Sequence, residues 1–264
     1  MSDRHEVWAV GDLYEPYVGR WSRAVAREFV AWLGVDAGGD WLDVGCGTGA
    51  LSDVIVHHAE PRTVVGVDPS ADFVAYATAH LGSAHVTFRV GDAQDLPLED
   101  DSVDAAVSGL VLNFVGDPAR GVAQMARVAR PGGVVAAYVW DYTGGMQMMR
   151  LFWDAAVELD PRAGTYDEGP RFPLCHPDAL GAVFADAGLG GVAVRAIEVP
   201  TRFTDFDDYW TPFLGGHFPA PAYAMSLPGE RRDELRERLR AKLPIAADGS
   251  IDLVARAWAV RGSA

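Results

Sequence analysis

Residues 40–49 have the sequence DWLDVGCGTG, a short apolar run that ends in alternating glycines. Residues 40–44 are typical of a buried strand, and residues 48–58, which follow the glycines, indicate a helix. Alternating glycines allow backbone torsions that are closed to other residues, and they let a ligand lie directly on the main chain. The first N–H groups of the following helix have no partner inside the helix. The stretch therefore predicts a strand, a turn and a helix, with a ligand bound at the turn.

Similar apolar runs recur along the chain and alternate with helical patterns. Further strands are predicted at residues 63–67, 86–90, 103–108, 134–140, 192–199 and 251–260. Helices are predicted at residues 21–33, 70–81, 117–129, 146–159, 177–187 and about 230–242, with Ser70 and Asp117 as caps. Strands that are apolar on both faces and separated by helices form a parallel sheet covered on both sides. We therefore expect an α/β fold with a mostly parallel seven-stranded sheet.

Two irregular, aromatic-rich stretches interrupt this alternation. We expect a single domain over residues 1–264, whose parts are a helical cover (1–40), a ligand-binding core (41–140), insertions at 141–175 and 201–250, and a final strand (251–264). Ligands of open α/β sheets bind outside the carboxyl ends of the strands. Because both insertions follow strands of the sheet, we expect them to form a lid over such a site.

Charge and composition exclude several classes of partner. Thirty-seven acidic residues face 22 basic ones, which gives a formal net charge of -15. A surface this negative disfavours nucleic acid and anionic membranes. Two cysteines make neither a disulfide framework nor a zinc cluster. The first residues lack an apolar signal segment, and no run reaches the ~20 apolar residues that a membrane helix needs. We expect a cytoplasmic protein, and the sequence leaves its oligomeric state open.

Three further features accompany the glycine-rich turn. The G-x-G-x-G spacing differs from the G-x-G-x-x-G of dinucleotide-binding turns. Asp68 ends the second strand and could accept both hydroxyls of a ribose. Residues 91–93 (GDA) end the third strand, and residues 129–133 (ARPGG) precede the fifth. Together these features resemble class I S-adenosylmethionine-dependent methyltransferases of the type 11, or ubiquinone-biosynthesis-like, group. The resemblance covers residues 41–140 and, more loosely, 177–199; it is specific for the cofactor and nearly silent on the substrate.

The resemblance implies a Rossmann-like class I methyltransferase fold and a set of cofactor contacts. Asp43, Gly45 and Gly49 would line the methionine end of S-adenosylmethionine, with Cys46 and Gly47 in the same turn. Asp68 and Pro69 would lie at the ribose, Asp92 and Ala93 at the adenine, and Ser108 beneath the sulfonium. Tyr14, Tyr17 and Arg20 would belong to an N-terminal segment that closes over the cofactor, where an arginine suits a carboxylate. S-adenosylhomocysteine would be the product.

Each of these assignments has a structural alternative. Asp43 could cap the following helix, Asp68 could be an N-cap, and Asp92 could be a solvated loop acid. The two tyrosines could be core aromatics, and Arg20 could pair with a surface carboxylate. Cys46 is interpreted as a small space-filling residue, because nothing near it in the sequence would stabilise a thiolate.

The insertions hold the candidates for binding the methyl acceptor. Tyr142, Met146, Tyr209, Phe213 and His217 are the candidate acceptor contacts, although most lid aromatics must serve packing. His217 is the candidate general base, with Asp141 and Tyr142 as others. No metal-ligand cluster is visible, and the Asn/Asp-Pro-Pro-Tyr/Phe motif of amino-group methyltransferases is missing after the fourth strand. A small organic acceptor, methylated on oxygen or carbon rather than on nitrogen, is therefore favoured.

Two alternative functions remain open at this point. A catalytically silent protein could keep the cofactor pocket, because methyltransferases lack a diagnostic catalytic residue. A nicotinamide-dependent oxidoreductase on a related fold is disfavoured by the glycine spacing.

Overall fold

The computed structural model describes residues 19–216 and 218–264, which divide into two compact units. The sheet unit comprises residues 22–140, 174–197 and 257–264. The insert unit comprises the described residues up to Trp21 together with 141–173 and 198–256. The boundary at 140/141 coincides with the predicted end of the ligand-binding core. The two predicted insertions fall largely within the insert unit.

The helices and strands agree closely with those predicted up to residue 128. The structure contains α2 (Arg20–Leu33), β1 (Asp40–Val44), α3 (Ala50–His58), β2 (Thr63–Asp68), α4 (Ala71–Leu81), β3 (Val86–Val90), β4 (Val103–Gly109), η2 (Leu112–Phe114), α5 (Pro118–Val128), β5 (Ala129–Trp140), α6 (Gln147–Leu159), η3 (Pro161–Thr165), α7 (Glu168–Arg171), α8 (Pro177–Asp186), β6 (Gly190–Phe203), α9 (Phe206–Trp210), η4 (Thr211–Leu214), α10 (Pro219–Ser226), α11 (Gly229–Lys242) and β7 (Ile251–Ser263). The predicted caps are confirmed, since Ser70 accepts from the N–H of Phe73 and Asp117 from that of Arg120.

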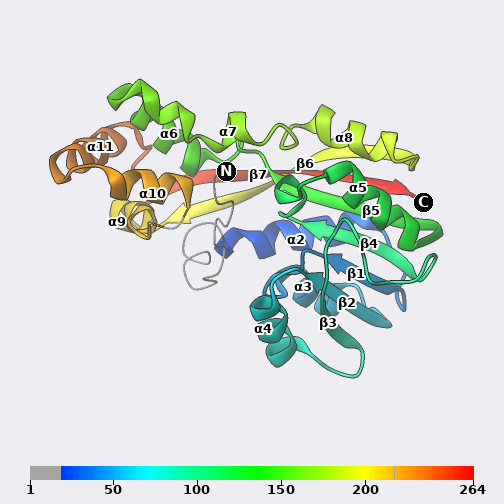
Figure 1. Ribbon diagram of the computed structural model, residues 1–264. Coiled ribbons are helices and arrows are strands. Elements are labelled where there is room, and N and C mark those ends of the chain that lie inside the picture. The colour runs from blue at the N-terminus through cyan, green and yellow to red at the C-terminus, as the bar shows by residue number, and fades with distance from the viewer. Residues whose placement is uncertain (1–18, 217) are drawn as a thin grey trace. The chain divides into compact units, whose positions relative to one another are not determined.

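The seven strands form one sheet in the order β3-β2-β1-β4-β5-β7-β6 (Figure 1). The first five run parallel, and β7 pairs antiparallel to β5. This confirms the predicted α/β fold with a mostly parallel seven-stranded sheet. Chain order reverses between β1 and β4, so the carboxyl ends of these two strands form the switch point at which such sheets bind ligands.

Helices cover both faces of the sheet unit. In Figure 1, α2, α3 and α4 lie on one face, and α5 and α8 lie on the other. The ring of Phe29 from α2 packs on that of Tyr138 from β5, with 4.7 Å between their centroids. Most of the helix predicted as part of an N-terminal cover, residues 22–33, therefore belongs to the sheet unit. The crossover from β3 to β4, residues 91–102, is a loop with no helix.

The strand β5 begins earlier than the sequence indicated. A turn was expected at residues 131–133, with the strand starting at 134, whereas β5 runs from Ala129. Gly132 has a φ of 81°, and the pairing with β4 shifts register between Val103 and Ala105. A residue with positive φ inside a strand makes a local irregularity and leaves pairing intact on both sides.

The insert unit is more helical than the sequence suggested for residues 201–228, whereas α11 confirms the helix predicted at about 230–242. Short helices and α11 fill most of residues 201–250, and they pack around an aromatic cluster. The rings of Phe152 and Phe213 stack at 4.4 Å with 12° between their planes. The hydroxyl of Tyr209 donates to the backbone oxygen of Met148 at 2.9 Å. These contacts give the insert unit its own core.

Candidate active site

The turn between β1 and α3 exposes one glycine and packs the others. A Cβ added at Gly45 would lie 2.4 Å from Cγ1 of Val111, and one at Gly49 would lie 2.6 Å from Cδ1 of Leu81. A Cβ added at Gly47 would meet no atom within 4 Å. Gly45 and Gly49 are therefore required by the packing of the protein itself. Gly47 is the position at which a ligand can approach the main chain.

Asp68 lies at the carboxyl end of β2 and holds this turn in place. Its Oδ2 accepts from the N–H of Gly47 and its Oδ1 from the N–H of Ser70, both at 2.9 Å. The side chain is mostly buried, and this burial raises the pKa of the carboxyl group. The N-cap of α4 is Ser70 rather than Asp68. Each carboxylate oxygen still has a lone pair for a further donor, so the residue fits the ribose role that the resemblance implies.

Asp43 is a buried carboxyl group with one unsatisfied oxygen. The hydroxyl of Ser52 donates to its Oδ2 at 2.7 Å, while Oδ1 has no hydrogen-bond partner in the described part of the chain. Burial raises the pKa of Asp43 to about 7, against the opposing effect of Ser52. Asp43 does not cap α3, whose N-cap is Gly49. Because a buried oxygen without a donor is unfavourable, this atom is suited to a donor from a ligand.

Other unsatisfied polar atoms gather at the same edge of the sheet. Among the described residues of the sheet unit, five side chains each hold one buried polar atom without a partner: Trp41, Asp43, Ser108, Asn113 and Trp140. All except Trp41 lie at, or just after, the carboxyl end of β1, β4 or β5. Unpaired buried donors and acceptors are rare in folded proteins. Their concentration at the switch point marks the place where a ligand completes the hydrogen bonding.

The backbone is strained at this edge as well. Leu110 follows β4 directly and has a φ of 62°. A bulky residue in the left-handed region costs about 1–2 kcal/mol, and such strain is concentrated at functional sites. No sequence pattern indicates the strain at Leu110 or the unpaired donors of Asn113 and Trp140. Of the unpaired group, only Asp43 and Ser108 had been predicted as site residues.

Three predicted contacts have more ordinary surroundings. Asp92 is exposed, and its Oδ1 accepts from the N–H of Gln94 at 2.8 Å in a local turn. Ala93 is half-buried and Pro69 is exposed. Their roles at the adenine and the ribose stay predictions.

Cys46 is buried, and burial raises the pKa of its thiol, as do the nearby Asp43 and Asp68. It therefore remains a protonated thiol, in agreement with a space-filling role.

The candidate residues of the insert unit are occupied by contacts inside that unit. Arg20 forms an ion pair with Asp208 at 3.0 Å, and its guanidinium lies 4.7 Å from the ring centroid of Trp21. This is the surface pairing that was the alternative to a cofactor contact. The candidate acceptor contacts are all buried: Tyr142, Met146, Tyr209 and Phe213. Their contact with an acceptor stays a prediction. Tyr14, Tyr17 and His217 lie outside the described residues.

Both carboxylate oxygens of Asp141, a candidate base, accept hydrogen bonds within the protein. Its Oδ1 accepts from the hydroxyl of Thr143 and the N–H of Gly144, and its Oδ2 accepts from Nε of Arg256 at 2.8 Å. Burial raises the pKa of Asp141, but these hydrogen bonds and the Arg256 charge lower it further, and the net pKa lies below its ordinary value. An acid this strong is a poor general base at neutral pH.

Glu168 is a buried acid that was not predicted from the sequence. It belongs to the insert unit, where Nε1 of Trp153 donates to its Oε2 at 2.6 Å. Burial raises the pKa of Glu168 to about 7. Its neighbours in the chain are polar, and nothing in the pattern of residues 160–172 distinguishes it from a solvated acid.

Comparison with known proteins identifies the family of the chain. A family model described as a methyltransferase domain matches residues 42–137, which hold the glycine turn, Asp68 and Ser108. The demethylmenaquinone methyltransferase of Roseiflexus castenholzii is 30% identical over 169 residues, covering 59% of this chain and 70% of that protein. The malonyl-[acyl-carrier protein] O-methyltransferase of Pectobacterium atrosepticum is 33% identical over 193 residues, which cover 67% of this chain and 74% of that protein. The chain belongs to the S-adenosylmethionine-dependent methyltransferases. It is a class I enzyme of the type 11 group.

The likeness is uneven along the length of the relatives. For several other curated relatives the chain spans only 30% to 44% of their length. Among solved structures, phosphoethanolamine N-methyltransferase 2 of Haemonchus contortus, in complex with phosphomonomethylethanolamine and S-adenosylhomocysteine, superposes with a TM-score of 0.58 at 17% identity. That match covers 95% of this chain and 56% of the other, and it shows the shared fold.

No helix among the described residues is long and apolar enough to cross a membrane. In the same residues, no group of three or more histidine, cysteine, aspartate or glutamate side chains is arranged to hold a metal ion.

Proposed function

We propose that this methyltransferase transfers a methyl group from S-adenosylmethionine to a small organic acceptor, on oxygen or carbon. The observation that carries the proposal is the open main chain at Gly47 between the carboxyl groups of Asp43 and Asp68. S-adenosylmethionine supplies a methyl group on a sulfonium, whose leaving group is a neutral thioether.

The residues of the sheet unit would hold the cofactor in distinct ways. Asp68 would accept the ribose hydroxyls with the lone pairs that Gly47 and Ser70 leave free. The unpaired Oδ1 of Asp43 would accept from a donor at the methionine end. Ser108, whose hydroxyl has no partner among the described residues, would lie at the sulfonium. These residues bind and orient, and positioning of this kind supplies a large part of the rate of a displacement.

The preference for oxygen or carbon rests on two supports. This chain covers most of the length of two relatives, which are named as a demethylmenaquinone methyltransferase and a malonyl-[acyl-carrier protein] O-methyltransferase. The segment at the carboxyl end of β4, residues 108–111, reads SGLV and lacks the motif of amino-group methyltransferases. The net charge of -15 further favours a small-molecule acceptor over nucleic acid.

Calorimetric titration with S-adenosylmethionine and S-adenosylhomocysteine, with NADH as a control, tests the proposal first. We expect both cofactor forms to bind with micromolar affinity and NADH not to bind. Incubation of the protein with S-adenosylmethionine and a panel of phenols, carboxylic acids and enolisable ketones then tests methyl transfer. Mass spectrometry detects the methylated products. Cofactor binding without transfer to any member would support a silent binding protein, and NADH binding in place of S-adenosylmethionine would refute the cofactor assignment.

A further inference from the structure

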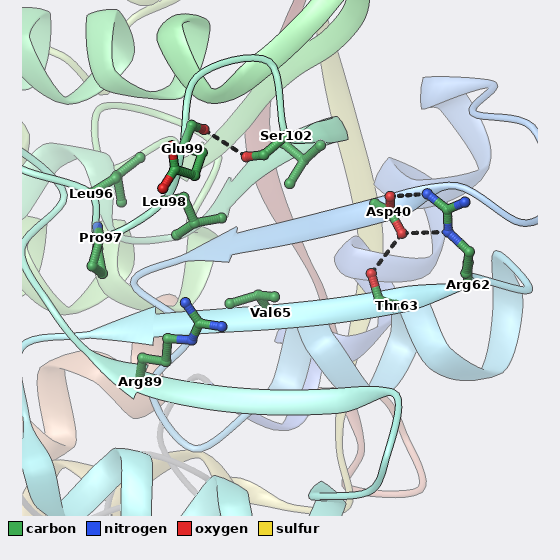
Figure 2. A pocket seen from close by; sticks show the side chains of 11 residues that line it. Asp40, Arg62, Thr63, Val65, Arg89, Leu96, Pro97, Leu98, Glu99 and Ser102 are labelled. Atoms are coloured by element: carbon green, nitrogen blue, oxygen red, sulfur yellow. Dashed lines mark hydrogen bonds and ion pairs between the residues drawn. The ribbon is translucent and has the colours of Figure 1, made fainter.

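A second pocket lies in the sheet unit, away from the glycine turn. It has a volume of about 610 Å³, within the range of small-molecule sites. It follows one face of β2 and reaches the amino ends of β1, β2 and β4 (Figure 2). Neither Gly47, Asp43, Asp68 nor Ser108 lines it. The pocket is therefore separate from the site proposed for the cofactor.

The pocket exists because one crossover has no helix. Both faces of a parallel sheet are normally covered by the helices of its crossovers. Here residues 91–102 form a loop, and Thr87 and Arg89 of the edge strand β3 are exposed. The loop residues Leu96, Pro97 and Leu98 stand over Val65 of β2 in place of a helix. The result is an apolar floor with an open side.

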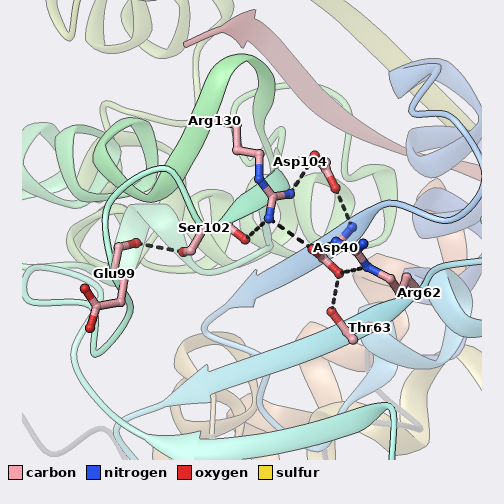
Figure 3. A network of polar contacts seen from close by, with 7 residues as sticks. All are labelled: Asp40, Arg62, Thr63, Glu99, Ser102, Asp104 and Arg130. Atoms are coloured by element: carbon pink, nitrogen blue, oxygen red, sulfur yellow. Dashed lines mark hydrogen bonds and ion pairs between the residues drawn. The ribbon is translucent and has the colours of Figure 1, made fainter.

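A neutral polar network closes one end of the pocket (Figure 3). Asp40 accepts from Nε of Arg62 at 2.8 Å, from the hydroxyl of Thr63 at 2.7 Å and from Nη2 of Arg130 at 3.1 Å. Arg130 also pairs with Asp104 at 2.6 Å. The two arginines and two aspartates cancel in charge, and the hydrogen bonds hold the pKa of Asp40 well below its ordinary value. Asp40 is thus a neutralised carboxylate that repels an anion only weakly.

Two charged side chains of the pocket remain available. Arg89 extends from β3 over the apolar floor, and Glu99 lies on the other side of the pocket (Figure 2). Neither side chain has a hydrogen bond or ion pair with another described residue. The Arg62 guanidinium adds no net charge at the closed end, because Asp40 neutralises it, but the N–H groups of its Nη1 are not used by Asp40. The pocket thus holds unused N–H donors on Arg89 and Arg62, and Glu99 is its one carboxylate without a partner among the described lining residues.

We propose that this pocket binds a small organic carboxylate with an apolar body of several carbons. Arg89 holds the carboxylate, because a guanidinium presents forked donors that match it in geometry and keeps its charge at every accessible pH. Val65 and Leu98 contact the apolar body. Glu99 opposes the anion and limits its affinity. The site is independent of the methyl donor and adds a second ligand to the protein.

Binding of sodium hexanoate to the full chain, followed by calorimetry and by NMR shifts, tests this site. We expect saturable binding that persists when S-adenosylhomocysteine is present in excess, and weaker binding of acetate, which lacks the apolar body. Hexylammonium chloride should not bind. Displacement of hexanoate by S-adenosylhomocysteine, or no saturation up to about 50 mM, would overturn the proposal.

Opposite effects of two substitutions provide the sharper test. Arg89→Gln should weaken hexanoate binding about tenfold, the typical effect of losing a charge-assisted pair, whereas Glu99→Gln should strengthen it a few-fold. Arg27→Gln is the matched control, because Arg27 is an exposed arginine of α2 with no hydrogen bond or ion pair among the described residues. It should leave binding unchanged. Affinity for S-adenosylhomocysteine should be the same in all three variants. An equal effect of Arg89→Gln and Arg27→Gln, or weaker binding after Glu99→Gln, would refute the anion site.

Discussion

At the scale of single residues, substitutions at Gly45 and Gly47 should have different effects, the first on protein stability and the second on ligand binding. A methyl group at Gly45 strikes Val111, so Gly45→Ala should lower the free energy of unfolding by about 1–3 kcal/mol through overpacking. A methyl group at Gly47 meets nothing, and its φ of 52° adds only about 1 kcal/mol of backbone strain. Gly47→Ala should instead weaken S-adenosylhomocysteine binding at least tenfold. Urea unfolding and calorimetry measure the two effects. Normal binding by Gly47→Ala would show that the ligand does not lie on this turn.

The carboxylate of Asp68 tests the ribose contact in a similar way. Asp68→Asn keeps the size of the side chain but removes the charge and turns an NH₂ group toward the N–H of Gly47 or Ser70. We expect affinity for S-adenosylhomocysteine to fall about 10- to 100-fold, the effect of losing a charged hydrogen-bond partner. Asp186→Asn, at an exposed acid that ends α8 and has no proposed role in the site, is the comparison and should have little effect. Equal losses in the two variants would remove the special role of Asp68.

At the scale of secondary structure, the contact between α6 and α7 makes the insert unit sensitive to pH. Glu168 is buried beside Trp153, and the ion pair of Arg150 with Asp167 adjoins it. The pKa of Glu168 is raised from 4.5 to about 7, so between these values the folded protein binds more protons than the unfolded chain. Stability must then fall as the pH rises through this window, by an amount on the order of 3 kcal/mol.

Glu168→Gln removes this titration while keeping an oxygen that can accept from Trp153. The variant should lose less stability than the native protein between pH 5 and pH 8, measured by urea unfolding across the range. Part of the pH dependence should persist, because Asp43 in the sheet unit also has a pKa raised to about 7. Parallel pH profiles for the two proteins would show that Glu168 does not titrate in this window.

Elements were predictable from the sequence where a pattern is local. Strands such as residues 40–44 and 63–68 are short apolar runs bounded by glycine, proline or aspartate, and their place follows from that pattern alone. The start of β5 at Ala129 was missed because its pairing with β4 passes through a glycine and a proline that normally end a strand. The short helices η4 and α10 were missed because prolines and aromatics break their periodicity. The longer α11 was predicted, because its leucines recur at helical spacing.

The candidate site also contains residues that local sequence patterns predict and residues that they do not. The glycine turn and Asp68 were predictable because their spacing is itself the signal. The unpaired N–H groups of Asn113 and Trp140 become visible only when the neighbours of each atom are known. The second pocket depends on the absence of a helix between β3 and β4, which brings Arg89 and Val65 to an open face. The sequence also predicted no helix between residues 90 and 103, but the side chains that face one another across this opening come from separate strands and were not predictable from local patterns.

At the scale of the whole molecule, the net charge of -15 distinguishes the two forms of the cofactor. S-adenosylmethionine has one net positive charge, since its sulfonium and ammonium outweigh its carboxylate, whereas S-adenosylhomocysteine is neutral overall. The field of an acidic protein attracts the first and acts little on the second. Asp43 and Asp68 add to this field at the glycine turn. The substrate form should therefore gain affinity at low ionic strength, and the product form should not.

Salt should remove this difference, because the screening length falls from about 30 Å at 0.01 M to about 3 Å at 1 M. We expect the dissociation constant of S-adenosylmethionine to rise several-fold between 0.02 M and 0.5 M sodium chloride, while that of S-adenosylhomocysteine stays nearly constant. Calorimetry at pH 8, where Asp43 is mostly ionised, should show the largest effect, and the effect should shrink at pH 6, where Asp43 is mostly protonated. Equal salt dependence of the two ligands would mean that the charge of the protein does not reach the site. The acids of the turn would then act through hydrogen bonds alone.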